Sequence, residues 1–358
     1  MTNNALENDL EHVLAHTQAL WDEFRGSRIF ITGGTGFFGS WLLETWTLAN
    51  ERFGLGGEAV VLTREPAAFQ ERAPHLAYHA SVSLHQGDVR TFDFPPGRFS
   101  HVIHAATPSN PKTTAPGPFA TLDTILYGTR RTLECAVQTG AKKFLSISSG
   151  AVYGQQPAAI AHLTEDHCGA PDPLNVRSEY GEGKRVAELL GALYSHQYGV
   201  QVKIARCFAF VGPYLPLDVH FAVGNFIWDG LKGGPVHVAG DGTPYRSYLY
   251  AADLVIWLWT ILAQGQSCRP YNVGSELALT IGELAQRIAD HFGVKRVIQR
   301  EAISGQSAQR YVPSTQRAET ELGLRLWVSL DEAIERTIRW HQTRRALADP
   351  SVGEGSPG

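Results

Sequence analysis

The feature that most constrains the fold is a glycine-rich turn near the start of the chain. The segment GGTGFFG follows the apolar run RIFIT (28–32) and spaces Gly33, Gly36 and Gly39 as G-x-x-G-x-x-G, ahead of a helical pattern. Such a turn lets the backbone approach a pyrophosphate, whose charge then lies at the positive N-terminus of the next helix. The sequence therefore predicts a dinucleotide-binding unit here, with a purely structural turn as the alternative.

Strand-like and helix-like patterns then alternate along the chain. The predicted strands are RIFIT (28–32), AVVLT (59–63), VSLHQ (82–86), HVIHAA (101–106), KKFLSIS (142–148) and VKIARCF (202–208). Helical patterns lie between them, which implies right-handed crossovers and a parallel sheet covered on both faces. We therefore predict an α/β protein built on a Rossmann-type, doubly wound parallel sheet.

Four regions are predicted along the chain. Residues 1–26 carry an extra N-terminal helix, and 27–212 form the dinucleotide-binding domain with its catalytic residues. The alternation loosens after residue 212, so 213–345 are assigned to a smaller, mixed C-terminal region that mainly binds substrate, with amphipathic helices at 280–292 and 329–345. Residues 346–358 are small and polar and are predicted to be a disordered tail.

Composition argues against several classes of function. A formal net charge of -4 disfavours nucleic-acid binding and a polybasic membrane surface. The four cysteines lack metal-site spacing, and His101, His104 and His220 are isolated, so no metal site is predicted. The most apolar stretch, ADLVIWLWTILAQG, is too short to span a bilayer and reads as a buried helix, and no signal peptide is visible. The expected location is the cytoplasm.

A second motif places a phenol beside an ammonium. In RSEYGEGKRV (177–186), Tyr180 stands four positions ahead of Lys184, so a helix brings both side chains to one face. An adjacent positive charge lowers the pKa of a phenol from its unperturbed value of about 10 toward neutrality. The pair is either a proton-transferring site or an ordinary solvated helix surface.

The end of the second strand bears on the choice between NAD and NADP. In NAD sites an acidic residue usually ends this strand and binds the ribose, whereas here the strand runs into Thr63, Arg64 and Glu65, with no carboxylate at the strand end itself. A guanidinium suits a 2′-phosphate, so NADP is slightly favoured over NAD unless Arg64 only faces solvent. The other residues expected at the cofactor are Thr35, Phe37, Phe38, Asp88, Val89, Ala105, Ala106 and Thr107.

Six motifs in order resemble those of a known family. They are GGTGFFG, GDVR, HAAT (104–107), SSGAVYG (148–154), YGEGK and YNVGS (271–275). Over roughly 27–345 the chain resembles the extended short-chain dehydrogenase/reductase family, in particular its nucleotide-sugar epimerases, dehydratases and decarboxylases. The resemblance implies that Tyr180 is the acid/base residue and that Lys184 holds the nicotinamide ribose and lowers the pKa of the phenol. Ser149 matches the hydroxyl that binds the reacting oxygen, with Ser148 as the alternative.

Positions 150 and 151 bear on the reaction. Related dehydratases carry an acid pair there and related decarboxylases a glutamate at the second position, whereas Gly150 and Ala151 cannot move protons. The helix motif YGEGKRVAE nevertheless looks like the decarboxylase version, so the two signals conflict. The missing carboxylates favour hydride transfer at a sugar ring carbon, by a C4 epimerase or a keto-sugar reductase. The alternatives are a 4,6-dehydratase or decarboxylase and, from another class, a non-catalytic NAD(P)-binding sensor or scaffold.

The resemblance also implies substrate contacts. Asn225 in VGNFI, Arg246 in GDGTPYRSYLY and Arg310 in QRYVPS match positions that contact the nucleotide-diphosphate sugar in relatives. Ala209 stands where relatives have an asparagine facing the sugar, which implies that this protein holds its sugar differently.

Two helices are expected to form a subunit interface. In relatives the helices matching LDTILYGTRRTLECAV and YGEGKRVAELLGALY build a four-helix bundle between two copies. Leu126, Leu133, Leu189 and Leu193 are the apolar residues expected on this face, so we predict a homodimer.

Overall fold

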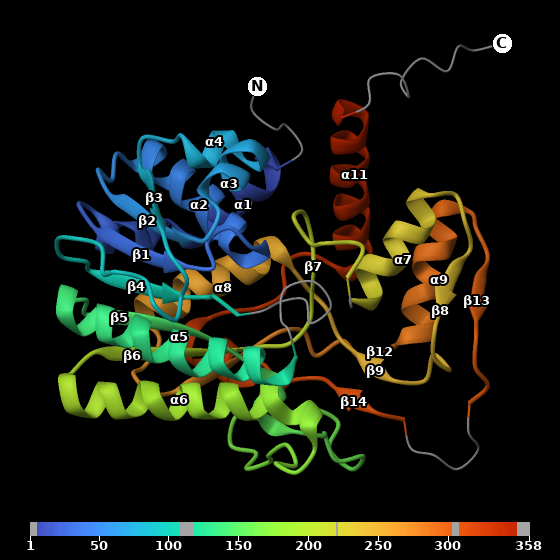
Figure 1. The fold of residues 1–358 in the computed structure, drawn as a ribbon. Coiled ribbons are helices and arrows are strands. Elements are labelled where there is room, and N and C mark those ends of the chain that lie inside the picture. Colours follow the sequence, from blue (N-terminus) through green and yellow to red (C-terminus); the bar gives the residue numbers. More distant parts are fainter. Residues whose placement is uncertain (1–5, 108–116, 220, 303–307, 349–358) are drawn as a thin grey trace.

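A seven-stranded parallel sheet forms the centre of the structure, a computed structural model that describes residues 6–107, 117–219, 221–302 and 308–348 (Figure 1). Across the sheet the strands are β11 (Pro270–Val273), β6 (Gln201–Cys207), β5 (Lys143–Ser149), β4 (His101–His104), β1 (Arg28–Thr32), β2 (Glu58–Thr63) and β3 (Val82–Gln86). Every pairing within it is parallel. The chain order reverses at β1, between β2 and β4, which is the topological switch point where doubly wound folds bind ligands. The predicted α/β, Rossmann-type fold is confirmed.

The six predicted strands all form, with small differences at their ends. The fourth prediction ran to residue 106, whereas β4 ends at His104 and Ala105 to Thr107 leave the sheet. The seventh strand, β11, lies in the segment that the sequence marked only by the motif YNVGS. The four residues of β11 read PYNV, and a segment this short that begins with proline and contains an asparagine carries too little hydrophobic pattern to be assigned as a strand.

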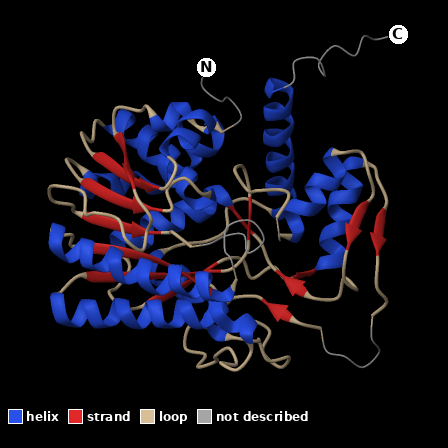
Figure 2. Cartoon of the chain, viewed as in Figure 1, coloured by secondary structure: helices blue, strands red, loops and turns tan. Residues whose placement is uncertain are grey.

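Helices cover both faces of the sheet (Figures 1 and 2). One face carries α5 (Pro118–Thr139) and α6 (Glu179–Tyr198), which pack against each other and against β4, β5 and β6. The other carries α1 (Glu7–Thr17), α2 (Phe37–Phe53) and α8 (Ala251–Gln264), with the short helices α3 (Pro66–Arg72) and α4 (Pro74–Ala77) beside them. The apolar segment ADLVIWLWTILAQG forms α8, whose residues 251–263 are all buried. Burial on every side explains why this helix is apolar all round.

A smaller mixed region lies beside the sheet (Figure 1). Its helices are α7 (Ala222–Leu231), α9 (Ile281–Phe292), α10 (Gln316–Leu322) and α11 (Leu330–Ala348). Its strands are β7 (Phe210–Val211), β8 (Val236–Val238), β9 (Tyr245–Arg246), β10 (Leu249–Tyr250), β12 (Leu279–Thr280), β13 (Arg296–Ile298) and β14 (Arg310–Tyr311). They pair as β10-β7, β12-β9-β14 and β13-β8. Although α8 and β11 follow residue 212 in the chain, they belong to the large sheet and the layer that covers it. The division at residue 212 stays a prediction.

The predicted N-terminal helix is part of the folded core. It consists of α1 followed by a 3₁₀ turn (Gln18–Phe24), and its buried Asp9 joins three elements. The Asp9 carboxylate accepts a hydrogen bond of 2.5 Å from the Tyr250 hydroxyl on β10 and pairs with the Arg336 guanidinium on α11. Thus α1, which packs on α2 and α8 in the layer that covers the large sheet, is linked to β10 and to the C-terminal helix α11.

Two predictions about individual segments need correction. Residues 346–348 were assigned to a disordered tail, whereas they form the end of α11; residues 349–358 lie outside the described part of the chain. Leu133 was expected on the outer face of α5, whereas it is fully buried against the sheet. Leu126 and Leu133 are seven positions apart, which is close to two helical turns. Their spacing alone therefore does not show that Leu133 is fully buried while Leu126 stays half-buried.

Candidate active site

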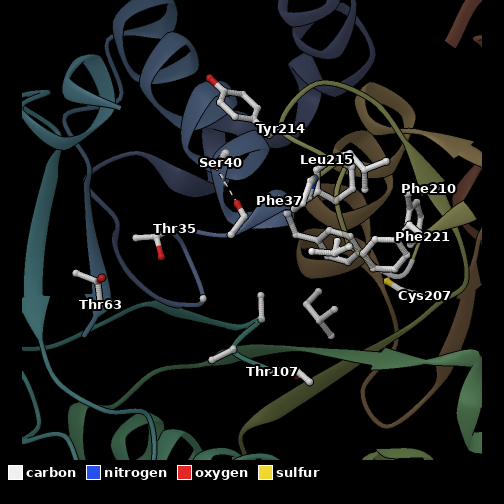
Figure 3. A pocket seen from close by; sticks show the side chains of 18 of the residues that line it. Thr35, Phe37, Ser40, Thr63, Thr107, Cys207, Phe210, Tyr214, Leu215 and Phe221 are labelled. Atoms are coloured by element: carbon white, nitrogen blue, oxygen red, sulfur yellow. Dashed lines mark hydrogen bonds between the residues drawn. The ribbon is translucent and has the colours of Figure 1, made fainter. Parts of the chain in front are cut away.

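A cavity of about 1370 Å³ opens at the carboxyl ends of the central strands. Residues that directly follow or end β1, β2, β3, β4, β5 and β6 line it: Gly33, Thr35, Gly36, Arg64, Asp88, Val89, Ala105, Ala106, Thr107, Ser149 and Cys207. Figure 3 shows Thr35 and Thr63 on one side of this space and Cys207, Phe210 and Phe221 on the other. The cavity therefore occupies the switch point that the fold leaves open.

The glycine turn brings the backbone of β1 close to its neighbours. Gly33 has a φ of +72°, and a Cβ placed on it would lie 2.6 Å from the carbonyl carbon of Ala105. A Cβ on Gly39 would lie 2.3 Å from the Cα of Gly34. Side chains at these positions would collide with backbone, so the turn requires glycine at both.

The helix that follows this turn can hold an anion. Gly36 donates its N–H to the Gly33 carbonyl (3.1 Å), and α2 begins at Phe37. The first N–H groups of a helix lack partners within the helix, so they and the helix dipole favour a negative group at this end. The cradle, the helix terminus and the size of the cavity fit the pyrophosphate of a dinucleotide.

Two arginine side chains, Arg64 and Arg72, line the part of the cavity beside the end of β2 and the glycine turn. Arg64, at the end of β2, is exposed and lines the cavity. Arg72 on α3 donates to the Thr35 carbonyl (2.6 Å), which places a second cation beside the glycine turn. Asp88 is held by Arg90, which donates its backbone N–H (2.9 Å) and its Nε (2.8 Å), and these hydrogen bonds lower the pKa of the carboxyl. Within the described residues, neither Arg64 nor Arg72 forms an ion pair with a carboxylate.

Lys184 is a buried cation in the middle of the site. Its ammonium donates to the Thr107 hydroxyl (2.7 Å) and to the Ile147 carbonyl (2.7 Å). The side chain is almost inaccessible, and burial lowers the pKa of Lys184 from 10.5 to about 8. No carboxylate contacts the ammonium among the described residues, so the charge faces the cavity without a neutralising partner.

Tyr180 and Ser149 stand beside that cation. The Lys184 Nζ lies 5.9 Å from the centre of the Tyr180 ring, as expected one helical turn along. The Ser149 hydroxyl accepts the Ala151 N–H (3.1 Å). Burial raises the pKa of Tyr180, and a hydrogen bond with Ser149 lowers it, with a net rise. The sequence predicted a lowered pKa, and the sign is reversed because burial of the phenol outweighs the favourable contact.

Ser148, the alternative to Ser149, is engaged elsewhere. Its hydroxyl donates to Glu188 on α6 (2.5 Å), and Arg206 binds the same carboxylate at 2.7 Å. This ion pair holds Ser148 away from Tyr180, which favours Ser149 as the hydroxyl at the reaction centre.

Two of the residues expected to bind substrate, Arg246 and Arg310, lie on β9 and β14 and are not among the residues that line the cavity. Arg246 on β9 is half-buried and lies 5.8 Å from the ring of Tyr311, which in turn reaches Ser149. Arg310 stacks over the Tyr245 ring (4.3 Å), and its buried Nε has no hydrogen-bond partner in the described structure.

Asn225 lies away from the cavity wall. Its amide nitrogen donates to the carbonyls of Leu217 (3.1 Å) and Val219 (2.7 Å), so it caps the loop that walls the cavity. His220, the histidine considered for the sugar, lies outside the described residues. The catalytic and binding roles of all these residues stay predictions.

Several residues that line the cavity or contact its lining carried no recognisable sequence signal. Tyr311 on β14 places its hydroxyl 3.4 Å from Ser149 Oγ, across 162 positions of chain. Tyr214 has an unusual φ of +69°, and its hydroxyl bonds Glu44 on α2. Trp340 and His341 on α11 complete the wall. Only long-range packing brings these residues to the site, and no local pattern reports it.

The two histidines on β4 have structural partners. His104 lies between the hydroxyls of Thr32 (2.8 Å) and Thr129 (3.1 Å), and burial lowers its pKa to about 3, so the ring is neutral. His101 contacts the Glu23 carboxylate at 3.0 Å. Across the described ranges, no three His, Cys, Asp or Glu side chains gather in a way that would hold a metal ion. Nor does any described helix combine the length and apolar character that a membrane crossing needs.

Comparison with known proteins agrees with this geometry. Residues 29–274 match the model of the NAD-dependent epimerase/dehydratase family. UDP-glucuronic acid decarboxylase 6 of Arabidopsis thaliana is 33% identical over 263 residues, which cover 74% of each chain. UDP-glucuronic acid decarboxylase 1 of the same plant is 30% identical over 91% of this chain and 72% of its own length.

Solved structures share the fold. A dTDP-glucose 4,6-dehydratase from Streptomyces venezuelae, with NAD bound, is 28% identical and superimposes with a TM-score of 0.75 over 90% of this chain and 99% of its own. A UDP-glucose 4-epimerase from Thermotoga maritima reaches a TM-score of 0.74 at 21% identity, over 89% of this chain and 99% of its own, which supports the fold alone. The chain belongs to the NAD-dependent epimerase/dehydratase family and is an enzyme of the nucleotide-sugar-modifying type.

The burial of Lys184 predicts a specific dependence of stability on pH. The lysine of the unfolded chain keeps its proton up to 10.5, whereas that of the folded chain loses it near 8. Between these values the unfolded state binds more protons, so the stability of the wild type rises with pH relative to Lys184→Met. We expect a relative gain of about 2 kcal/mol between roughly pH 7.5 and 9.5, measured by urea unfolding.

The exposed Lys142 provides the matched control, because Lys142→Met removes a solvated ammonium from the same domain. The difference in the free energy of unfolding between Lys142→Met and the wild type should stay constant over the same pH range. Parallel pH profiles for Lys184→Met and the wild type would show that the ammonium is not held in the buried environment described above.

Proposed function

We propose that this enzyme transfers a hydride between a nicotinamide cofactor and a ring carbon of a nucleotide-diphosphate sugar, as a C4 epimerase or a keto-sugar reductase. The observation that carries the proposal is the combination of Tyr180, Ser149 and Lys184 in one cavity with no carboxylate at positions 150 and 151. Proton transfer at a sugar hydroxyl needs only the first three groups, whereas elimination of water needs a further acid and base.

Each residue has a distinct task in this proposal. The bound cofactor supplies the centre that accepts and returns the hydride. Tyr180 takes the proton of the sugar hydroxyl during oxidation and returns it during reduction, while Ser149 holds the same oxygen by a hydrogen bond. The Lys184 ammonium, free on its cavity side, orients the ribose of the cofactor and favours the ionised phenol once the site is filled.

The diphosphate of the sugar nucleotide requires cations near the reaction centre. Arg246 and Arg310 lie outside the cavity lining, on the strands β9 and β14, which pair in parallel. The unpartnered Nε of Arg310 leaves a hydrogen-bond donor available to a phosphate oxygen. We assign both guanidiniums to the diphosphate and Asn225 to supporting the loop beside it.

Decarboxylation of a UDP-linked uronic acid is the second candidate. It is favoured by the similarity to UDP-glucuronic acid decarboxylases, which extends over most of this chain. Transfer of the C4 hydride to the bound nicotinamide would make the C5 carboxylate part of a β-keto acid, and carbon dioxide would leave as its bonding electrons pass into the C4 carbonyl. Protonation at C5 and return of the hydride to C4 would then give a product that differs from the substrate by one CO2. Ala151 provides no acid to protonate the resulting enolate, so this route must use Tyr180 or water.

A panel of nucleotide sugars tests the proposed activity. We expect epimerisation to leave the mass of one sugar nucleotide unchanged, reduction to add two hydrogens, and decarboxylation to remove one CO2, all resolved by chromatography and mass spectrometry. Tyr180→Phe should slow the reaction roughly a hundred- to ten-thousand-fold while the cofactor still binds. Tyr198→Phe, at the exposed end of the same helix, should keep full activity. Cofactor binding without conversion of any sugar would point instead to a sensor or scaffold.

Cofactor choice is tested at Arg64, and NADP is the slightly favoured cofactor. If Arg64 recognises a 2′-phosphate, Arg64→Ala loses a charge-assisted hydrogen bond of about 1.5–3 kcal/mol, which weakens NADP binding roughly ten- to a hundred-fold and leaves NAD unchanged. Calorimetric titration of both oxidised cofactors into stripped protein measures this. Equal effects on the two cofactors would remove the support for NADP and favour an epimerase that retains NAD.

We also propose a homodimer formed through α5 and α6. Leu189 and Leu193 are 57% and 52% exposed on α6, and the half-buried Leu126 lies on the adjacent α5. Light scattering at micromolar concentration should show a dimer in the wild type and a monomer in the double variant Leu189→Glu, Leu193→Glu, because the carboxylates would be buried without partners. Leu277→Glu changes a leucine that is 66% exposed outside these helices, and this variant should stay dimeric. A monomeric wild type would contradict the proposal.

A further inference from the structure

Two phenols converge on one serine hydroxyl at the reaction centre. Tyr180 arrives from α6, and its interaction with Ser149 lowers the pKa of the phenol against the larger rise that burial causes. Tyr311 arrives from β14, in the smaller region, and its hydroxyl lies 3.4 Å from Ser149 Oγ. The proposed chemistry assigns Tyr180 and Ser149 and leaves the second phenol without a task.

The packing around Tyr311 defines where its hydroxyl lies. The ring of Tyr311 packs against Phe208, with 4.6 Å between the ring centroids. The guanidinium of Arg246, on the neighbouring strand β9, lies 5.8 Å from the centre of the Tyr311 ring. β14 itself pairs with β9. Three separate elements therefore position this hydroxyl at Ser149, which makes the contact a property of the fold.

The hydrogen-bonding capacity of Ser149 decides the direction of each bond. A serine hydroxyl has one proton to donate and two lone pairs to accept with. The Ala151 N–H occupies one lone pair at 3.1 Å. If Tyr311 donates to the other lone pair, the single proton of Ser149 is left for Tyr180, where it stabilises the ionised phenol.

The proposed role of Tyr180 decides which phenol donates. Lys184 on α6 lies 5.9 Å from the Tyr180 ring, Arg246 on β9 lies 5.8 Å from the Tyr311 ring, and Cys207 at the end of β6 lines the same cavity. Burial raises the pKa of both phenols. Once Tyr180 has given up its proton it can only accept a hydrogen bond, so the proton of Ser149 points to Tyr180 and Ser149 accepts from Tyr311.

We propose that Tyr311 is a positioning residue, whose hydroxyl donates to Ser149 and thereby turns the only proton of Ser149 toward Tyr180. This inference deepens the proposed function and rests on Tyr180 as its acid/base group. It gives a physical role to a residue that lies on a different chain segment from the catalytic motifs, in a site whose positions 150 and 151 have no ionisable side chain.

The test measures the ionisation of Tyr180 directly and needs no substrate. Tyrosinate absorption is followed against pH in protein saturated with NAD, and the transition that Tyr180→Phe abolishes is assigned to Tyr180. In Tyr311→Phe the midpoint of this transition should lie about one pH unit higher, the size expected for one lost hydrogen bond to an ionised network. An unchanged midpoint would overturn the proposal.

Two further variants separate positioning from general disturbance. In a Ser149→Ala background the Tyr311→Phe substitution should have no further effect, because Tyr311 acts through that serine. Tyr271→Phe removes a different phenol hydroxyl, bound to Glu321 at 3.0 Å far from the site, and should leave the midpoint where it is. Equal shifts in Tyr271→Phe and Tyr311→Phe, or an additive effect in the Ser149→Ala background, would also overturn the proposal. Because no turnover is measured, failure of the proposed sugar chemistry gives a separate result.

Discussion

The close backbone contact between the glycine turn and the strand beside it is the constraint on which the site depends. Gly33 meets the backbone of Ala105 and Gly39 meets that of Gly34 at distances that exclude any side chain. The contact lets α2 start immediately beside β1 and lets the segment after β4 pass next to the turn. The cavity is the space left where these two segments diverge, and its floor includes the ends of six neighbouring strands. A methyl group at either glycine would therefore alter the shape of the whole site as well as the turn.

The reaction centre combines groups that are unfavourable for folding on their own. Lys184 is buried without a carboxylate, and Tyr180 loses water without gaining a charged partner at its hydroxyl. Nearby, the ion pair between Glu188 and Arg206 is neutral overall and binds Ser148. The charges of Glu188 and Arg206 therefore neutralise each other next to the site, whereas the charge of Lys184 inside the site has no neutralising partner among the described residues. Burial without compensation is typical of groups whose proton affinity matters for chemistry.

Local patterns predicted most of the fold and the part of the site that lies at strand ends. The glycine turn, the strand runs and the Tyr180–Lys184 spacing each depend on residues only a few positions apart, so their geometry follows from the element that contains them. Tyr214 and Trp340 reach the cavity, and Tyr311 reaches Ser149, through contacts between distant segments, which leave no periodic pattern in the sequence. The prediction that Leu133 lies on the exposed face of α5 was wrong for a related reason. The spacing of apolar residues in a helix does not show whether an apolar face packs against the sheet or against another subunit. The sign of the Tyr180 pKa also depended on burial, which is a property of the assembled site.

The link between Asp9 and Arg336 has a consequence for how the protein is made. Arg336 stands one helical turn before Trp340, so the anchor of α1 also holds the part of α11 that walls the cavity. Because α11 is the last described helix in the chain, the pair between Asp9 and Arg336 and the wall that Trp340 gives the cavity can form only after the other described elements have been synthesised.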